Sequence, residues 1–260
     1  MTDMKERIQA YLDAECPWRD TLHWYCVTDS TNTQAKLLAK AGAPHGTVLI
    51  AGHQTGGRGR MGRTFRSPEG QGVYLSVILR PECKPEALMH LTCAAGVAMA
   101  EAVEKVSGIR PGLKWINDLV VEGKKLGGIL VEMSVDKGLV DYAIVGIGIN
   151  CLQQEDDFPP EIREIATSLA INGKKVPPAV LAGAMLQALY SMDISQKEET
   201  LRRYKTDCMT LGQDVIILRG DDRQFGKASD LDGDSCLIVE YPDGRREKVS
   251  SGEASVRGMY

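Results

Sequence analysis

The order of hydrophobic and polar positions along the chain predicts a mixture of strands and helices. Apolar runs of strand length, rich in β-branched and aromatic residues, indicate strands at 21–28, 47–53, 72–80, 112–121, 126–133 and 139–150. Patterns with a helical period indicate helices at 1–16, 31–41, 85–106, 161–170 and 178–206. The segment Glu122-Gly123-Lys124 is a hairpin signal between two of the strands. We therefore expect an α+β core.

The pattern changes near Leu211. From there, short strands alternate with turns rich in Asp, Gly and Pro, such as 230–234 and 241–245, over about fifty residues. This alternation predicts a small all-β module, of the kind that closes into a barrel. We expect three parts: an N-terminal helical extension over 1–20, a core over 21–207 and the module over 208–260.

The composition limits the classes of protein to which the chain can belong. Hydrophobic residues make up 43% of the 260 residues and charged residues 25%, which is ordinary for a globular protein. A net charge of -4 argues against bulk electrostatic binding to DNA or to an acidic membrane. The first residues lack the apolar core of a signal peptide, and we find no run that approaches the ~18 apolar residues of a membrane helix.

Cysteine and histidine spacing adds a prediction about location and metals. The seven cysteines are scattered, odd in number and without a CxxC pair, which is typical of a reduced, cytoplasmic protein. The four histidines show no ligand spacing with cysteines or carboxylates. We therefore expect no dedicated metal site.

One glycine-rich and arginine-rich segment, GGRGRMGR at 56–63, carries the first candidate chemistry. Gly57, Gly59 and Gly62 have the GxGxxG spacing of a dinucleotide-binding loop, but Ser67-Pro68 indicates a turn where that motif needs a helix. A P-loop is excluded because the Gly-Lys-Ser/Thr triplet is absent from the sequence.

The arginines favour an anionic ligand for this segment, which we call the Gly/Arg loop. Arg58, Arg60 and Arg63 would repel one another, whereas an opposite charge at 4 Å contributes ~4 kcal/mol at an effective dielectric near 20. Such pairs can offset the entropy lost when a glycine-rich loop becomes ordered. We therefore favour a loop that an anion orders; a flexible, solvated basic loop is the alternative.

Other segments supply possible companions, each with a purely structural alternative. Lys114-Trp115-Ile116-Asn117-Asp118 and Lys125 lie near the ends of two predicted strands, where a lysine is usually a solvated strand end. Gly127-Gly128 suggests close approach of the backbone to another group. Asn150 has the alternative of a simple turn residue, and Gly146 and Gly148 that of tight packing. Thr31 and Gln34 fit a capping box at the start of a helix.

Four motifs in this order resemble a biotin–protein ligase: GRGRMGRTFRSPEGQGVYLSVIL, KWINDLVVEGKKLGGILVE, VGIGIN and SSGEASVR. The resemblance runs from about Thr28 to Arg257. It implies a mixed β-sheet catalytic core flanked by helices, of the class II synthetase-like, biotin/lipoate ligase type, with a C-terminal SH3-like β-barrel.

The resemblance also implies an activity. Members of the family use ATP and Mg²⁺ to convert biotin to biotinyl-5′-AMP and pyrophosphate. They then form a carbon–nitrogen bond between biotin and one lysine of a biotin carboxyl carrier protein, such as that of acetyl-CoA carboxylase. ATP and Mg²⁺ are co-substrate and activating ion, and no tightly bound prosthetic group is expected. Monomer and homodimer both stay open.

The resemblance assigns roles to residues of this chain. The biotin site is Ser30, Thr31, Asn32, Gln54, Arg58, Gly59, Arg60, Lys125, Gly127 and Gly128. The adenylate site is Arg60, Arg63, Phe65, Asn117, Lys125 and Asn150. The catalytic residues are Lys125, Arg60 and Arg58. Biotin is itself the nucleophile, so a set of cations and amides suffices to bring its carboxylate to the α-phosphate.

Departures from the family pattern leave two rivals open. Ile116 replaces a common proline and Phe65 a common tryptophan, which affects adenine packing at most. About twenty residues precede the first strand, too few for the winged helix-turn-helix of some members, so we expect no DNA binding. A lipoate or octanoate ligase and an inactive scaffold whose β-module binds a partner are the rivals; the intact Gly/Arg loop and Lys125 oppose them.

Overall fold

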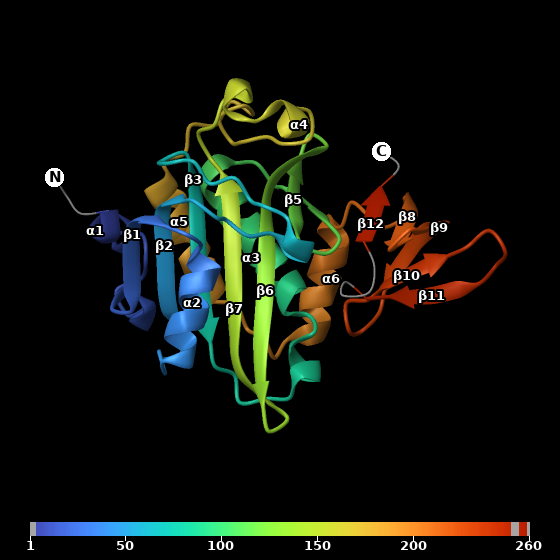
Figure 1. Cartoon of the computed structure of the whole chain (residues 1–260), viewed down its shortest axis with the longest axis horizontal. Helices are drawn as coiled ribbons and strands as arrows, with labels where there is room; N and C mark the ends of the chain where they lie inside the picture. Colours follow the sequence, from blue (N-terminus) through green and yellow to red (C-terminus); the bar gives the residue numbers. More distant parts are fainter. Residues whose placement is uncertain (1–3, 251–254, 259–260) are drawn as a thin grey trace.

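The computed structural model describes residues 4–250 and the backbone of 255–258, and its core is a seven-stranded mixed sheet (Figure 1). The strand order is β1-β2-β3-β7-β6-β5-β4, with β1 and β2 parallel and the other neighbours antiparallel. The strands are β1 (Leu22–Thr28), β2 (Thr47–Gln54), β3 (Gly72–Leu79), β4 (Gly112–Lys114), β5 (Asp118–Val121), β6 (Lys124–Asp136) and β7 (Leu139–Asn150). The expected mixed sheet is confirmed.

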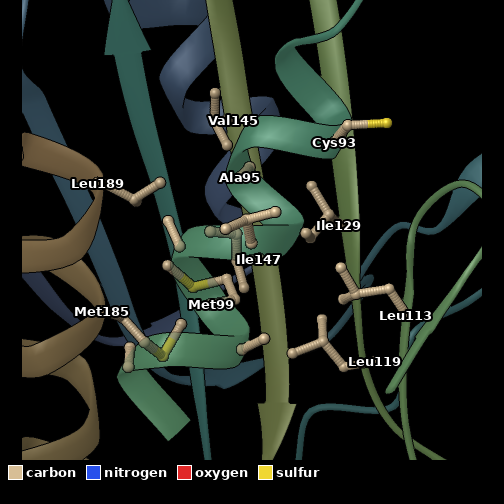
Figure 2. Close-up of a cluster of buried hydrophobic side chains, with 14 of the residues drawn as sticks. Cys93, Ala95, Met99, Leu113, Leu119, Ile129, Val145, Ile147, Met185 and Leu189 are labelled. Carbon is tan, nitrogen blue, oxygen red and sulfur yellow. The ribbon is translucent and has the colours of Figure 1, made fainter. Parts of the chain in front are cut away.

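Helices cover both faces of this sheet. They are α1 (Met4–Gln9), α2 (Thr31–Lys40), α3 (Leu91–Ser107), α4 (Pro160–Arg163), α5 (Pro178–Tyr190) and α6 (Lys197–Asp207). Helix α2 lies in front of the sheet in Figure 1 and packs Ala35 and Ala39 on Leu49 and Ile144. The larger core lies on the opposite face, where Figure 2 shows Met99 of α3 between α5 and the sheet.

Helix α3 is the central helix of the core. The sequence predicts one helix over 85–106, whereas the chain forms a 3₁₀ turn (Pro85–Leu88) and then α3, which ends at Gly108 with φ +74°. By length and composition alone, 85–107 is long and apolar enough to cross a membrane. However, 72% of its apolar window is buried inside the protein, as in the core helix of a globular fold.

The predicted strand over 112–121 is interrupted. It forms two short strands, β4 and β5, which pair with each other around a turn at 115–117. The following hairpin turn contains only Glu122 and Gly123, with φ angles of 49° and 73°, as a two-residue turn of type I′ requires. Lys124 therefore belongs to β6, which extends to Asp136, beyond the predicted 126–133.

The predicted helices near both ends of the core are also shorter. The first ends at Gln9 and continues as local turns. The helix predicted over 161–170 ends at Arg163, because the backbone that follows bonds to neighbouring strands. The Lys125 amide donates to Ile165 O at 2.8 Å, and the Thr167 amide donates to Lys125 O at 2.9 Å. The predicted 178–206 helix is interrupted between α5 and α6, where Asp193 accepts from the Ser195 amide at 2.9 Å.

The C-terminal module is a five-stranded antiparallel sheet, as its turn pattern predicts. Its strands are β8 (Asp214–Arg219), β9 (Asp222–Leu231), β10 (Leu237–Glu240), β11 (Arg246–Val249) and β12 (Ser255–Gly258), in the order β11-β10-β9-β8-β12. In Figure 1 it lies beyond α6, on the β4 side of the core. The Lys205–Asp230 ion pair at 2.6 Å and the Met209 amide, which donates to Leu113 O at 2.9 Å, join it to the core.

Candidate active site

The predicted site residues gather around a cavity of about 160 Å³ on the α2 face of the sheet. Strands β6 and β7 form its floor, the start of α2 forms one wall, and the turn between β4 and β5 forms the other. The Gly/Arg loop lies over it. The predicted residues that line the cavity are Ser30, Thr31, Asn32, Gln54, Arg58, Gly59, Arg60, Arg63, Phe65, Asn117, Lys125 and Gly128.

Glycines make the floor of the cavity flat enough for other groups to approach. A Cβ on Gly146 would overlap the Asn32 amide, and a Cβ on Gly148 would overlap the Phe65 ring. A Cβ on Gly128 would lie 3.3 Å from the Lys125 Nζ. The packing alternative for Gly146 and Gly148 is therefore correct, and the groups that pack there are themselves site residues.

The start of α2 forms a polar corner that buried hydroxyl and amide groups hold in place. Gln54 Oε1 accepts from the Thr31 amide at 2.8 Å, and Gln54 Nε2 donates to Ser67 Oγ at 2.8 Å. The hydroxyl of Ser76, fully buried on β3, lies 2.8 Å from Thr31 Oγ1 and donates to Asn32 Oδ1 at 2.6 Å. Side chains bound in this way keep a fixed orientation toward the cavity.

The capping box expected at Thr31 and Gln34 is wrong. Helix α2 begins at Thr31, so Ser30 is the N-cap residue. The Gln34 side chain donates instead to Asp29 Oδ1 at 2.8 Å, and Asp29 also accepts from the Ser30 amide at 2.6 Å. The Thr31 amide and hydroxyl are consequently free to bind Gln54.

The Gly/Arg loop folds back on itself over the cavity. The Gly59 amide donates to Arg63 O at 2.7 Å, and the Phe65 amide donates to Gly57 O at 2.9 Å. Met61 and Gly62 at its tip have φ angles of 53° and 73°. The segment leads from β2 into β3 with only a 3₁₀ turn (Arg60–Gly62), which lacks the helix that a dinucleotide-binding loop requires.

Two basic side chains from different elements meet on the far wall. Arg60 Nη1 of the loop donates to Asn117 Oδ1 at 2.8 Å, and Lys125 Nζ of β6 lies 2.6 Å from Asp118 Oδ1. Burial lowers the pKa of Arg60, while the charge of Asp118 opposes that shift. A guanidinium nevertheless stays protonated at neutral pH. An anion at this wall of the cavity would therefore face the two cations Arg60 and Lys125.

Two predicted site residues lie outside the lining. Gly127 faces β7, where a Cβ would lie 2.5 Å from Gly148 O, so its role is close strand packing. Asn150 is buried at the end of β7; it donates to Thr167 O at 3.0 Å and accepts from Gln153 at 3.0 Å. The alternative of a structural residue describes Asn150 better than direct contact with a ligand in this cavity.

Sequence reasoning missed Ser76 and Glu132, and it gave no role to Trp115 and Asp118, which also shape the site. Ser76 is a hydroxyl within an otherwise apolar strand, and Glu132 is a carboxylate that follows Gly128 and Leu130 on the cavity side of β6. Asp118 lines the cavity, as does Trp115, whose indole N–H donates to Ser235 O of the C-terminal module at 2.9 Å. A polar residue inside a buried apolar strand was the one available signal.

The described part of the chain holds no group of three His, Cys, Asp or Glu residues positioned to bind a metal ion. Asp118 is the single carboxylate among the described residues that line the cavity. One carboxylate is enough for Mg²⁺ that arrives on a nucleotide, because that ion takes most of its ligands from phosphates and water.

Comparison with known proteins identifies relatives along most of the chain. A model described as the biotin/lipoate A/B protein ligase family matches 24–150, and one described as the biotin protein ligase C-terminal domain matches 210–257. The bifunctional ligase/repressor BirA of Bacillus spizizenii is 36% identical over 238 residues, which cover 86% of this chain and 71% of that protein. The biotin–[acetyl-CoA-carboxylase] ligase of Mycobacterium tuberculosis is 33% identical, covering 91% of this chain and 88% of that protein.

The three-dimensional fold agrees with these matches. The biotin protein ligase from Aquifex aeolicus, solved in complex with biotin and ATP, superposes with a TM-score of 0.72. That alignment covers 91% of this chain and 98% of the other, with 33% identical residues. Sequence identity above 30% over most of both chains, together with a shared fold, shows common ancestry. The chain therefore belongs to the biotin protein ligase family.

Proposed function

We propose that this protein is a biotin–protein ligase that converts biotin and ATP to biotinyl-5′-AMP and pyrophosphate. It then transfers biotin to a lysine of a biotin carboxyl carrier protein. The observation that carries the proposal is the meeting of Arg60 and Lys125 in a cavity whose other end is the polar corner at α2. That arrangement suits a ligand with a polar head at one end and a carboxylate, then a phosphate, at the other.

The first half-reaction needs charge neutralisation more than a protein nucleophile. The biotin carboxylate attacks the α-phosphorus of ATP, an acyl–phosphate bond forms and pyrophosphate leaves. Both reactants are anions, so Arg60 and Lys125 lower the barrier by stabilising the charge on the α-phosphate. Lys125 exchanges Asp118 for phosphate oxygens in this step. None of the described lining residues is Cys or His, which accords with biotin as the nucleophile.

We assign the ends of the cavity accordingly. Ser30, Thr31, Asn32 and Gln54 offer donors and acceptors for the ureido ring of biotin, and the glycine floor leaves space for the fused rings. Arg63, Phe65 and Asn117 flank the adenylate end. Asn150 acts indirectly, by holding the segment around Thr167 against the end of β7.

The second half-reaction needs the mixed anhydride to be shielded from water. The amine of the carrier lysine attacks the acyl carbon, an amide forms and AMP leaves. The Gly/Arg loop lies over the cavity and can exclude competing water until the carrier docks. The carrier of an acetyl-CoA carboxylase or similar enzyme is the expected acceptor, since the M. tuberculosis relative is named for that substrate.

Mg²⁺ enters in this proposal with ATP. When bound, the ion would neutralise phosphate charge and favour the departure of pyrophosphate, and Asp118 is the one lining carboxylate among the described residues that could hold it. We further propose the division into 1–20, 21–207 and 208–260, a cytoplasmic location, and the absence of a DNA or membrane partner. The net charge of -4 opposes bulk electrostatic binding to DNA or to an acidic membrane.

Acceptor labelling tests the proposal against its lipoate rival. The purified protein is incubated with ATP, Mg²⁺ and a biotin carboxyl carrier domain, with either biotin or lipoate, and the carrier is weighed by mass spectrometry. We expect the mass of one biotinyl group on one lysine, and an unmodified carrier with lipoate. Lipoylation without biotinylation would overturn the proposal in favour of the rival.

A further inference from the structure

Glu132 on β6 occupies a position between three parts of the site. Gly128 and Leu130 line the cavity from one face of this strand. Glu132 follows them on the same face, just beyond the end of the cavity. Its side chain is only 17% exposed, so its charge is partly removed from water. A carboxylate in such a position needs strong partners.

The partners of Glu132 come from the wall and the cover of the cavity. Its Oε1 lies 2.5 Å from Lys36 Nζ of α2 and 3.4 Å from Arg58 Nη2 of the Gly/Arg loop. Its Oε2 accepts from Asn32 Nδ2 at 3.0 Å. Burial opposes ionisation, yet the bonds from Lys36 and Asn32 prevail and keep the pKa of Glu132 below its ordinary value.

These bonds determine the orientation of Asn32. Its Oδ1 accepts from Ser76 at 2.6 Å, while its Nδ2 donates to Glu132. Its Nδ2 also donates to the backbone oxygen of Leu130 at 3.4 Å, so a flipped Asn32 would set its own oxygen against a carboxylate and a carbonyl. Glu132, together with the Leu130 carbonyl, thus fixes which atom Asn32 presents around the polar corner.

The same carboxylate ties down one side of the Gly/Arg loop. Arg58 reaches Glu132 on the α2 side, and Arg60 reaches Asn117 on the opposite side. Gly59 lies between these two arginines and Gly62 lies at the tip of the loop, so the backbone resists opening only weakly. Two side-chain attachments on opposite walls are a physical means of keeping such a loop closed.

We propose that Glu132 is a positioning residue of the ligase reaction, which fixes the Asn32 amide and fastens the Gly/Arg loop over the cavity through Arg58. The inference rests on the proposed function for its kinetic consequence, but the fastening of the loop is a property of the protein without substrates. It touches no reacting atom, so we expect it to govern biotin binding and adenylate retention more than the chemical step.

The first test measures the loop directly, without biotin or ATP. Limited digestion with trypsin, followed by mass spectrometry, reports the rate of cleavage after Arg60 and Arg63. We expect Glu132→Gln, which keeps the shape and removes the charge, to raise that rate about 3-fold, the scale of one partly exposed ion pair. Asp136→Asn, an exposed carboxylate on the same strand, is the matched control and should cleave as the wild type does.

The second test separates positioning from general damage. In biotin-dependent pyrophosphate exchange, Glu132→Gln should raise the KM for biotin about 10-fold, the scale of one lost charge-assisted hydrogen bond, while the maximal rate changes less than about 3-fold. In an Arg58→Met background the Glu132→Gln change should accelerate loop cleavage little further, because the shared contact is already lost. Arg58 is 45% exposed, so its substitution keeps the test available if Glu132→Gln fails to fold.

The outcomes distinguish this inference from the proposed function. Wild-type tryptic rates and a wild-type KM in Glu132→Gln, with normal exchange, would overturn the role of Glu132 and leave the ligase intact. Faster loop cleavage in Glu132→Gln, with no exchange even in the wild type, would uphold the fastening and overturn the ligase. If the effects of Glu132→Gln and Arg58→Met on loop cleavage add fully in the double variant, the two residues act independently. That result would contradict the proposed contact between them.

Discussion

At the scale of single residues, the site contains charges that are paired inside the protein before any substrate arrives. Lys125 lies 2.6 Å from Asp118, and Arg60 donates to Asn117 at 2.8 Å. Each basic group is therefore held near its working position, which reduces the reorganisation needed when a phosphate replaces the internal partner. Such pairs contribute little to stability, because they are partly exposed.

This arrangement predicts a specific loss for Lys125→Ala. We expect the rate of biotinyl-5′-AMP formation to fall on the order of 100-fold, the scale of one charged transition-state contact. The thermal unfolding midpoint should stay close to that of the wild type. The neighbouring Lys124→Ala is the matched control, since Lys124 does not line the cavity that the described residues form, and it should retain wild-type activity. A wild-type adenylation rate in Lys125→Ala would remove this lysine from the site.

The half-buried carboxylate of Glu132 predicts a dependence of stability on pH. Its pKa in the folded state lies below the ordinary 4.5, so ionised Glu132 stabilises the fold above about pH 4.5, and this stabilisation is lost as the pH falls through the lowered pKa. The difference in unfolding free energy between the wild type and Glu132→Gln should thus be largest near neutral pH and shrink in acid. Urea titrations at pH 7 and pH 4 measure it, and a difference that grows in acid would contradict the ion pairing.

At the scale of elements, the site depends on how closely α2 and the Gly/Arg loop approach β7. Gly146 and Gly148 leave the space that Asn32 and Phe65 occupy. Both glycines lie in a strand that is otherwise rich in Ile and Val, where glycine weakens the strand itself. The lower stability of the strand is offset because the missing side chains leave the space that Asn32 and Phe65 fill.

We therefore expect Gly146→Ala to displace Asn32 and weaken biotin binding. The added methyl should destabilise the protein by about 1–3 kcal/mol, the usual range for overpacking, and raise the KM for biotin. Calorimetry and pyrophosphate exchange measure the two effects. Gly233→Ala serves as control, because a methyl there meets nothing within 4 Å of the described structure. An unchanged KM in Gly146→Ala would show that Asn32 does not hold biotin.

The element scale also shows how far sequence reasoning reaches. Hydrophobic periodicity predicts the strands, α2, α3 and the C-terminal module. The motif residues come together because they lie on adjacent strands, near the ends or the centres of those strands. Glu132 and Ser76 could not be found by period, since each occupies an ordinary strand position whose partner is distant in the sequence. The irregular path after Arg163 escaped too, because its backbone bonds to Lys125 and Asn150 instead of forming a helix.

At the scale of the whole molecule, the C-terminal module is attached to the wall of the site. Trp115 lines the cavity, while its amide donates to Thr210 Oγ1 and its indole to Ser235 O, each at 2.9 Å. Ser235 is buried and has a φ of +65°, an uncommon conformation for serine. The module is thereby hydrogen-bonded directly to the turn that carries Asn117.

The central claim is that this chain, as a whole, adenylates biotin. The most direct measurement is biotin-dependent exchange of labelled pyrophosphate into ATP by the purified protein with Mg²⁺. The account predicts exchange that requires both biotin and Mg²⁺ and that falls on the order of 100-fold in Lys125→Ala. Folded wild-type protein that catalyses no exchange with biotin would contradict the account.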